Sequence, residues 1–120
     1  MPGWKPDGWH SITPRLVARD PAGLVRFLKH VFEARGEFAG ERPSEMQIGD
    51  SIVMVSGEGP RERTSSFLYL YVEDADATYR RAIEAGAISI EEPADMFYGD
   101  RRAMIEDPGG NVWQIATYRG

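Results

Sequence analysis

The sequence predicts an α+β fold in which two βαβββ modules form one curved, mostly antiparallel sheet. Both helices lie on its outer face, and its other face forms a concave cup. A repeated pattern supports this fold: residues 16–20 read LVARD, residues 70–74 read LYVED, and an amphipathic helical pattern and a glycine follow each stretch. Short apolar runs between turn residues come next in both halves, which is typical of strands. A strand–Asp–helix–Gly–strand unit used twice predicts two like halves with helices packed on a sheet.

The length of the chain predicts one domain, because 120 residues can bury a core of their own. The expected divisions are an N-terminal arm at 1–10 and a single domain at 11–118, with module one at 11–56 and module two at 66–118. The polar, Gly-rich residues 57–65 are the expected connection between the modules. Because Trp4 and Trp9 are large apolar side chains, we expect the arm to pack on the body or on a partner subunit.

The first module opens with a strand pattern at residues 11–19, in which Pro14 favours an edge position because proline cannot donate to a ladder. Asp20 and Pro21 predict a helix start, with the Asp as its cap and the Pro in its first turn. Gly36 is expected to end this unit. Apolar side chains at three- and four-residue spacing predict the buried face of the helix: Leu24, Phe27, Leu28, Val31 and Phe32.

Three short strands are expected after the first helix. Residues 36–40 form the first of them, and residues 44–48 and 51–55 form a hairpin across Gly49 and Asp50, a dipeptide type that favours tight turns between apolar runs.

The second module repeats this order. Residues 66–72 alternate between two apolar faces, which predicts a central strand. Asp74 or Asp76 is expected to cap the second helix, and Gly86 to stop it. The buried face of that helix is predicted at Ala77, Tyr79 or the stem of Arg80, Ile83 and Ala85. The remaining segments are predicted as a strand at 87–90, a loop at 91–99, and a closing hairpin of 102–106 with 111–118 across a turn at 107–110.

Composition excludes several classes of protein. The chain has no cysteine, so it has neither disulfides nor thiolate zinc sites, and a cytoplasmic location is expected. No apolar stretch approaches the roughly 20 residues that span a bilayer, and the first residues do not form a signal peptide. The net charge is -5 and the basic residues are scattered, so we expect neither a membrane nor a nucleic-acid partner.

The order and spacing of several short stretches resemble a known family. The matching stretches are TPRLV at 13–17, IGDSIVM at 48–54, YVEDADA at 71–77, FYGDR at 97–101 and EDPGGNVW at 106–113. With these stretches the chain resembles the vicinal oxygen chelate superfamily, which includes glyoxalases, bleomycin-resistance proteins and extradiol dioxygenases. The likeness runs from about residue 11 to residue 118. The resemblance implies the paired βαβββ fold, and a homodimer is expected because relatives often pair.

The resemblance also implies where a metal would be held, because metalloenzymes of this superfamily place one ligand, typically His or Glu, on each of four strands. The matching positions here are Thr13, Met54, Phe67 and Gln114. None of them is a histidine or a carboxylate, so neither a metal site nor a cofactor is predicted. His10 lies in the arm and His30 lies opposite the apolar face of its helix. An atypical site in which Glu45 and Gln114 join waters around a metal remains the alternative.

Strand alternation divides the strand side chains between the two faces of the sheet. The helix-facing set is predicted as Leu16, Val53, Val55, Leu68, Leu70, Val72, Trp113 and Ile115, and Ile52 belongs to the cup. The candidate ligand-binding residues are Thr13, Arg15, Met54, Phe67, Tyr69, Tyr71, Phe97, Tyr98, Met104 and Gln114. Aromatic rings with a few polar groups are typical of a small-molecule pocket. The alternative is that these side chains only fill the cup.

The stretch 97–101 is expected at the mouth of the cup. Phe97 and Tyr98 can form a lid there, while Asp100 and Arg101 are expected to hold the turn at Gly99 by ion pairing. Glu91, in the preceding loop, is expected to be solvated.

These patterns favour a protein that binds a small organic molecule in an aromatic cup without a metal. The first alternative is a metal-dependent lyase, isomerase or dioxygenase of the same superfamily with atypical ligands. The second is a non-catalytic structural dimer whose cup is filled. No Ser-His-Asp or Cys-His arrangement is available, so no catalytic residue is assigned.

Overall fold

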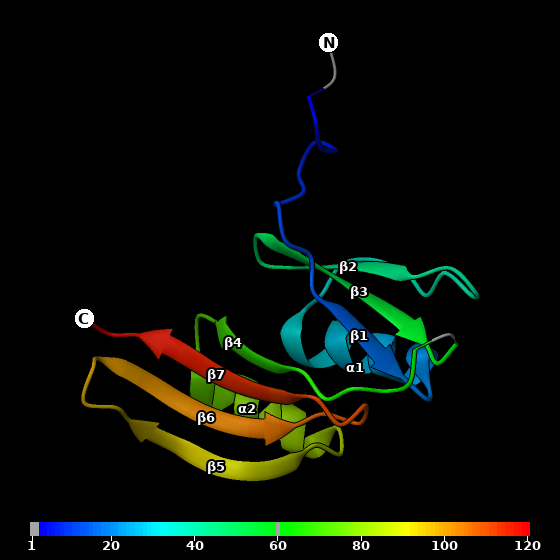
Figure 1. Ribbon diagram of the computed structural model, residues 1–120. Helices are drawn as coiled ribbons and strands as arrows, with labels where there is room; N and C mark the ends of the chain where they lie inside the picture. The colour runs from blue at the N-terminus through cyan, green and yellow to red at the C-terminus, as the bar shows by residue number, and fades with distance from the viewer. Residues whose placement is uncertain (1–2, 60) are drawn as a thin grey trace.

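The computed structural model describes residues 3–59 and 61–120, and Figure 1 shows how its elements are arranged. The first half contains β1 (Arg15–Ala18), α1 (Pro21–Phe32), β2 (Ser44–Ile48) and β3 (Ser51–Gly57). The second half contains β4 (Phe67–Tyr71), α2 (Ala75–Glu84), β5 (Ile88–Asp95), β6 (Asp100–Glu106) and β7 (Val112–Tyr118). Each half starts with a strand and a helix, as the repeated pattern predicts.

The strands form two sheets. The first sheet has the order β1-β3-β2 and the second has the order β4-β7-β6-β5. In each sheet the first strand of that half runs parallel to the last one, and the other neighbours are antiparallel. The α+β class is confirmed. The single continuous sheet expected from the sequence is not formed within one copy, where β1 and β4 are both edge strands and no ladder in the described chain joins them.

The two sheets are instead linked through the helices. One hydrophobic core contains side chains from both sheets and both helices. The Arg81 guanidinium of α2 donates to the backbone oxygen of Val31 of α1, at 3.2 Å from Nε and 2.9 Å from Nη2. The Phe32 ring of α1 lies 4.7 Å from the Trp113 ring of β7. Because α1 packs on both sheets, the core is buried without strand pairing between the halves.

The face of each sheet that lies away from the helices is called its open face below. The predicted helix-facing side chains lie in the core: Leu16, Val53, Val55, Trp113 and Ile115 are buried, and Leu68, Leu70 and Val72 are partly buried against it. This confirms the predicted phase of β1, β3, β4 and β7.

The helix caps follow the sequence, with two differences. Asp20 accepts a hydrogen bond from the Gly23 amide at 3.0 Å, and Asp74 accepts one from the Ala77 amide at 3.0 Å, which resolves the choice between Asp74 and Asp76. The first difference is that α1 ends at Phe32, before Gly36 is reached, and Glu33 is its C-cap residue with a φ of 57°. The second is that the buried side chains of α2 are Ala75, Thr78 and Ala82, whereas Ile83 is 37% exposed. Of the predicted residues, Tyr79 and Ala85 are partly buried and pack against the core.

Two predicted boundaries also change. Residues 36–40 form no strand, and only an isolated bridge between Arg35 and Gln47 is present. Gly36 has a φ of +135°, and a Cβ there would collide with the backbone oxygen of Glu45, so the chain turns at this point. In the second half, the expected loop at 91–99 is largely strand. β5 continues to Asp95 through two register irregularities, which accommodate Pro93 on an edge strand.

Residues 3–10 extend away from the body (Figure 1). Trp4 is 83% exposed, whereas Trp9 is half-buried. The expected packing of Trp4 on its own body is therefore wrong for one copy, and packing on a partner subunit stays a prediction. Within the described residues, no helix is both long enough and apolar enough to cross a membrane.

The turn between β6 and β7 is built around a buried carboxylate. Asp107, 3% exposed, accepts hydrogen bonds from the Gly109 amide at 2.8 Å, from the Asn111 amide at 3.0 Å and from Trp113 Nε1 at 2.7 Å. The Asn111 side-chain amide adds contacts of 3.2 Å. This single side chain therefore fixes both the turn and the orientation of the core Trp113 ring.

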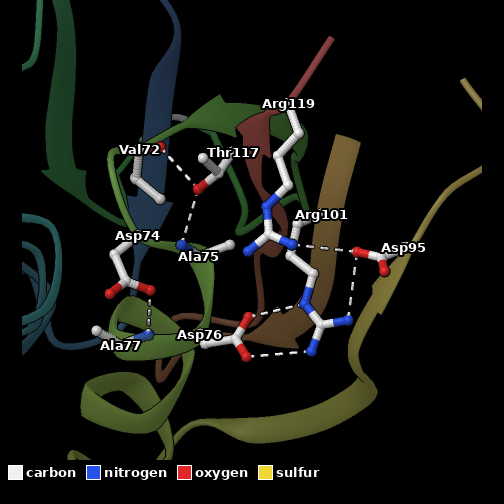
Figure 2. A network of polar contacts seen from close by, with 9 residues as sticks. All are labelled: Val72, Asp74, Ala75, Asp76, Ala77, Asp95, Arg101, Thr117 and Arg119. Atoms are coloured by element: carbon white, nitrogen blue, oxygen red, sulfur yellow. Dashed lines mark hydrogen bonds and ion pairs between the residues drawn. The ribbon is translucent and has the colours of Figure 1, made fainter. Parts of the chain in front are cut away.

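A polar network holds the start of α2 against the second sheet (Figure 2). Thr117 Oγ1 accepts from the Ala75 amide at 2.8 Å and donates to the Val72 oxygen at 2.9 Å. Arg101 binds Asp76 in a bidentate pair, with distances of 3.0 and 3.1 Å. Arg101 also contacts Asp95 of β5 at 3.4 Å. The network thus joins α2, β5, β6 and β7.

The Asp76–Arg101 pair predicts a pH-dependent contribution to stability. The hydrogen bond from Arg101 holds the pKa of Asp76 below its usual value of 3.8. The contribution is therefore present above about pH 4 and is lost as the pH falls through the lowered pKa. We expect Asp76→Asn to lower the urea midpoint at neutral pH and the gap to wild type to shrink at about pH 3. Asp95→Asn, which removes only longer contacts, is the control. A gap that is constant with pH would contradict the assignment.

Candidate functional site

The open face of the second sheet carries a row of exposed aromatic side chains on β4. Phe67, Tyr69 and Tyr71 are 68%, 40% and 59% exposed, while Leu68 and Leu70 between them pack on the core. Side chains two residues apart in a strand share a face, so the three rings line one side of β4. The expectation that Phe67 points away from the helices is confirmed.

Strand register extends this face across β7 and β6. Tyr69 pairs with Gln114, and Gln114 pairs with Met104, so these three residues form one row across the sheet. Alternation along β6 places Asp100 and Arg102 on the same face as Met104, because Ala103 and Ile105 between them are buried in the core. The face therefore combines aromatic, thioether, amide and charged groups.

Asp100 lies beneath the tyrosines and is 3% exposed. Its Oδ2 accepts hydrogen bonds from the hydroxyl of Tyr69 at 2.5 Å and from that of Tyr71 at 2.9 Å. The Tyr69 hydroxyl lies 3.1 Å from that of Tyr98, and Arg102 Nη1 donates to the Tyr98 oxygen at 3.1 Å. Because the Tyr69 hydrogen is directed to Asp100, Tyr98 must donate to Tyr69. The hydrogen bonds thus run in one direction, from Arg102 through Tyr98 and Tyr69 to Asp100.

The pKa of both phenols bound to Asp100 is raised. Burial and the hydrogen bond to Asp100 raise the pKa of Tyr69 far above its usual value of 10.0. The hydrogen bond to Asp100 likewise raises the pKa of Tyr71. Both groups therefore remain neutral phenols at physiological pH, held in place by a charged acceptor.

Arg102 is fixed on both sides of its guanidinium. Its Nη2 lies 2.7 Å from Glu91 Oε1 on β5, opposite the contact to Tyr98. Its Nε is buried and has no hydrogen-bond partner among the described residues. Glu91 is thus a strand residue and the ion-pair partner of Arg102, where the sequence predicted a loop, although its side chain is 47% exposed, as a solvated residue would be.

Two aromatic side chains stand on the turn between β5 and β6. Phe97 is fully exposed and Tyr98 is 45% exposed, with their ring centroids 5.2 Å apart in an edge-to-face arrangement. Gly99 has a φ of +103° and its oxygen accepts from the Arg119 amide at 2.9 Å, which holds the turn beside the end of β7. The Tyr98 ring is therefore joined to the β4 tyrosines through its hydroxyl, whereas Phe97 stands beside Tyr98 and is fully exposed.

The remaining predicted site residues lie on the first sheet. Met54 of β3 pairs with Arg15 on one side and with Glu45 on the other. Arg15 Nη2 lies 3.4 Å from Met54 Sδ, and Thr13 is half-buried just before β1. Glu45 and Arg15 are exposed, so this open face carries one acidic and one basic group around a thioether.

The fold separates these two sets of residues in one copy. A cleft of about 870 Å³ where the halves meet is lined by Tyr71, Phe32 and Arg81 among others. A second cleft of about 490 Å³ is lined by Arg15 and Val17 with the ends of β1 and β3. Neither cleft contains residues of both sets.

The family follows from comparison with known proteins. Residues 7–115 match the family described as the Glyoxalase/Bleomycin resistance protein/Dioxygenase superfamily. The chain belongs to this superfamily. The match covers both modules, from the end of the arm into β7, and agrees with the resemblance seen in the sequence.

Several known proteins are similar to this chain over most of its length. An uncharacterized protein of Mycobacterium bovis is 27% identical over 123 residues, which is 88% of this chain and 81% of that protein. TioX from Micromonospora sp. ML1 superposes with a TM-score of 0.77 at 23% identity, covering 91% of this chain and 98% of TioX. The fosfomycin resistance protein FosX from Mesorhizobium loti has a TM-score of 0.69 at 23% identity, covering 90% and 91% of the two chains.

The superfamily's usual metal position can be compared with the side chains present. Phe67 offers no donor atom, and the Met54 thioether suits soft cations only. Glu45 lies on the first sheet and Gln114 on the second. Among residues 3–59 and 61–120, no group of three or more His, Cys, Asp or Glu could hold a metal ion. This donor set does not fit the cation of the superfamily's metalloenzymes.

The sequence did not identify three residues of this site correctly. Asp100 does not pair with Arg101, as was expected, because the two point to opposite faces of β6: Arg101 binds Asp76, and Asp100 binds the tyrosines. Arg102 and Glu91 were also missed. Side-chain alternation along the strand could have identified Asp100 and Arg102, because a strand with Met104 on the open face has residues 100 and 102 on that face as well.

Proposed function

We propose that this protein binds a small organic molecule against the open face of its second sheet. The observation that carries the proposal is the exposed aromatic set above a buried, fixed polar network. Phe67 and Phe97 are 68% and 100% exposed, and a monomeric domain gains nothing from leaving such rings in water. Rings with a few oriented polar groups are the usual composition of a ligand-binding surface. Binding without chemical conversion is the simplest activity that this face supports.

A homodimer would complete the site. β1 and β4 are open edge strands of the two sheets, and open edges pair readily with other strands. Pairing β1 of one copy with β4 of the partner subunit would extend the first sheet into the second. That arrangement would form the continuous curved sheet expected from the sequence. It would also place Arg15 and Met54 beside the aromatic residues, so the proposed cup would be shared between subunits.

The dimer is tested by sedimentation equilibrium. We expect a mass near twice the 13.5 kDa of one chain. A mass of one chain at all accessible concentrations would contradict the shared cup. The proposed binding site would then consist only of the open face of the second sheet.

The binding proposal is tested with a panel of planar aromatic compounds, followed by protein fluorescence. We expect saturable changes for part of the panel. Phe67→Ala should weaken that binding about tenfold, the loss expected when one stacking ring is removed. Phe38→Ala, which removes a ring that is 45% exposed outside both sheets, is the matched control and should change nothing. Absence of saturable binding across the panel, or an equal loss in both variants, would refute the proposal.

A further inference from the structure

The charge beneath the aromatic residues is not balanced by a cation. Asp100 is buried, and none of the ion pairs formed by the described residues includes its carboxylate. Its only side-chain partners among these residues are the two neutral phenols of Tyr69 and Tyr71. The negative charge therefore lies directly under the ring surface, in a setting where water screens it poorly.

The nearest basic group on this face does not supply the missing charge, because Arg102 is paired with Glu91 at 2.7 Å. Glu106, on the same side of β6 as Met104, adds another carboxylate at the far end of the strand. Among the described residues of β5 and β6, the open face thus carries Glu91, Asp100 and Glu106 as acidic groups and Arg102 as a basic group. Arg15 and Glu45 on the first sheet stand on either side of Met54 and cancel each other.

The hydrogen-bond pattern of the tyrosines, like the charge of Asp100, favours a positively charged ligand. Tyr69 and Tyr71 both donate to Asp100, and Tyr98 donates to Tyr69, so all three phenol hydrogens are used inside the protein. What the tyrosines present to a ligand is therefore oxygen lone pairs and ring faces. Both attract positive charge, and ring faces attract cations most strongly when water is excluded.

The rings are also grouped closely enough to act together. The centroids of Tyr69 and Tyr71 lie 5.3 Å apart with the planes inclined at 55°, so they present two differently oriented faces. Phe97 and Tyr98 form a second such pair on the adjoining turn. Inclined aromatic faces that lie close together can enclose an alkylated ammonium group.

We propose that the ligand of this face is a small organic cation, with a methylated or aromatic positively charged nitrogen. The proposal rests on the function proposed above and narrows it to one class of ligand. The rings would enclose the cation while Asp100, beneath them, supplies the opposite charge.

The test compares three probes of similar size by calorimetric titration of the full chain: 1-methylquinolinium as the cation, quinoline under conditions where it is neutral, and 2-naphthoate as the anion. We expect the cation to bind about tenfold tighter than the neutral probe, and the anion to bind more weakly than either. The preference for the cation should decrease as salt is added, because the attraction is partly electrostatic.

Substitutions then assign the preference to its source. Asp100→Asn should reduce affinity for the cation about fivefold or more and affinity for the neutral probe less than about twofold. Asp50→Asn removes the same charge from an exposed turn and should change neither the affinity for the cation nor the affinity for the neutral probe. If Asp100→Asn does not fold, the proposal is tested by the ratio of the wild-type affinities for the cation and the neutral probe, and by the salt dependence of that ratio.

Three other outcomes of the titration would contradict the cation proposal. Equal binding of cation and neutral probe refutes the cation proposal and leaves the aromatic binding face intact. Preference for the anion refutes the cation proposal as well. An absence of saturable binding for all three probes refutes the cation proposal and counts against the binding face itself.

Discussion

Replacing Asp107 by Ala is expected to lower the free energy of unfolding by about 3 kcal/mol. The carboxylate accepts from two backbone amides, from Asn111 Nδ2 and from Trp113 Nε1, and all of these lie in the buried turn between β6 and β7. Removing it leaves several buried donors without an acceptor, and an unsatisfied buried donor costs roughly 1–3 kcal/mol. The Trp113 ring also loses its anchor, although it packs on Phe32 in the centre of the core.

Equilibrium unfolding in urea, followed by tryptophan fluorescence and circular dichroism, measures this loss. Asp107→Asn keeps one oxygen acceptor and should lose about half as much stability. Asp50→Ala, in the exposed turn between β2 and β3, is the control and should stay within about 0.5 kcal/mol of wild type. An Asp107→Ala variant as stable as this control would show that the buried carboxylate contributes no net stability.

The second large effect is expected in the titration of Tyr69. In the wild type its ring resonances should not shift up to about pH 11, because the raised pKa keeps the phenol protonated. Asp100→Asn removes the negative charge that opposes a tyrosinate while keeping an oxygen acceptor. The pKa of Tyr69 should therefore fall toward its usual value of 10.0 by more than one unit.

The same shift has a consequence for stability. Because the folded-state pKa of Tyr69 is raised above the unfolded value, its contribution is complete below about pH 10 and is lost as the pH rises through the folded-state value. Wild-type stability should thus decline in alkali more steeply than that of Asp100→Asn. NMR with tyrosine labelled in the ring resolves Tyr69 from the other tyrosines, and Tyr79→Phe, remote from Asp100, is the control. A wild-type Tyr69 that titrates near pH 10, or one that the substitution leaves unchanged, would contradict the network.

The helices show what local sequence predicts well and what it does not. The cap at Asp20 and the apolar face of α1 follow from residues close together in the chain, and both are confirmed. The buried face of α2 was predicted only in part: Tyr79 and Ala85 pack against the core, but the fully buried residues are Ala75, Thr78 and Ala82. Helical periodicity does not by itself identify small and polar side chains that tertiary packing buries.

In the candidate site, too, local sequence predicts some features and tertiary packing sets the others. Alternation placed Phe67, Tyr69 and Tyr71 on the open face of the sheet without reference to any other strand, and this is confirmed. The partners of Asp100 could not be predicted in that way. Its contacts span 29 and 31 residues of sequence and depend on β4 and β6 lying on either side of β7. The adjacent Arg101 suggested an ion pair, but neighbouring residues in a strand point to opposite faces.

The sequence by itself determined the superfamily resemblance, the two-module order, the helix caps and which side of each strand meets the helices. These depend on spacing within single segments, where the geometry of helix and strand is fixed. Tertiary structure alone decided that the strands divide into two sheets joined through helices, and that a buried carboxylate organises the tyrosines. Both depend on which segments lie side by side, since packing and desolvation act between atoms that are close in space whatever their separation along the chain.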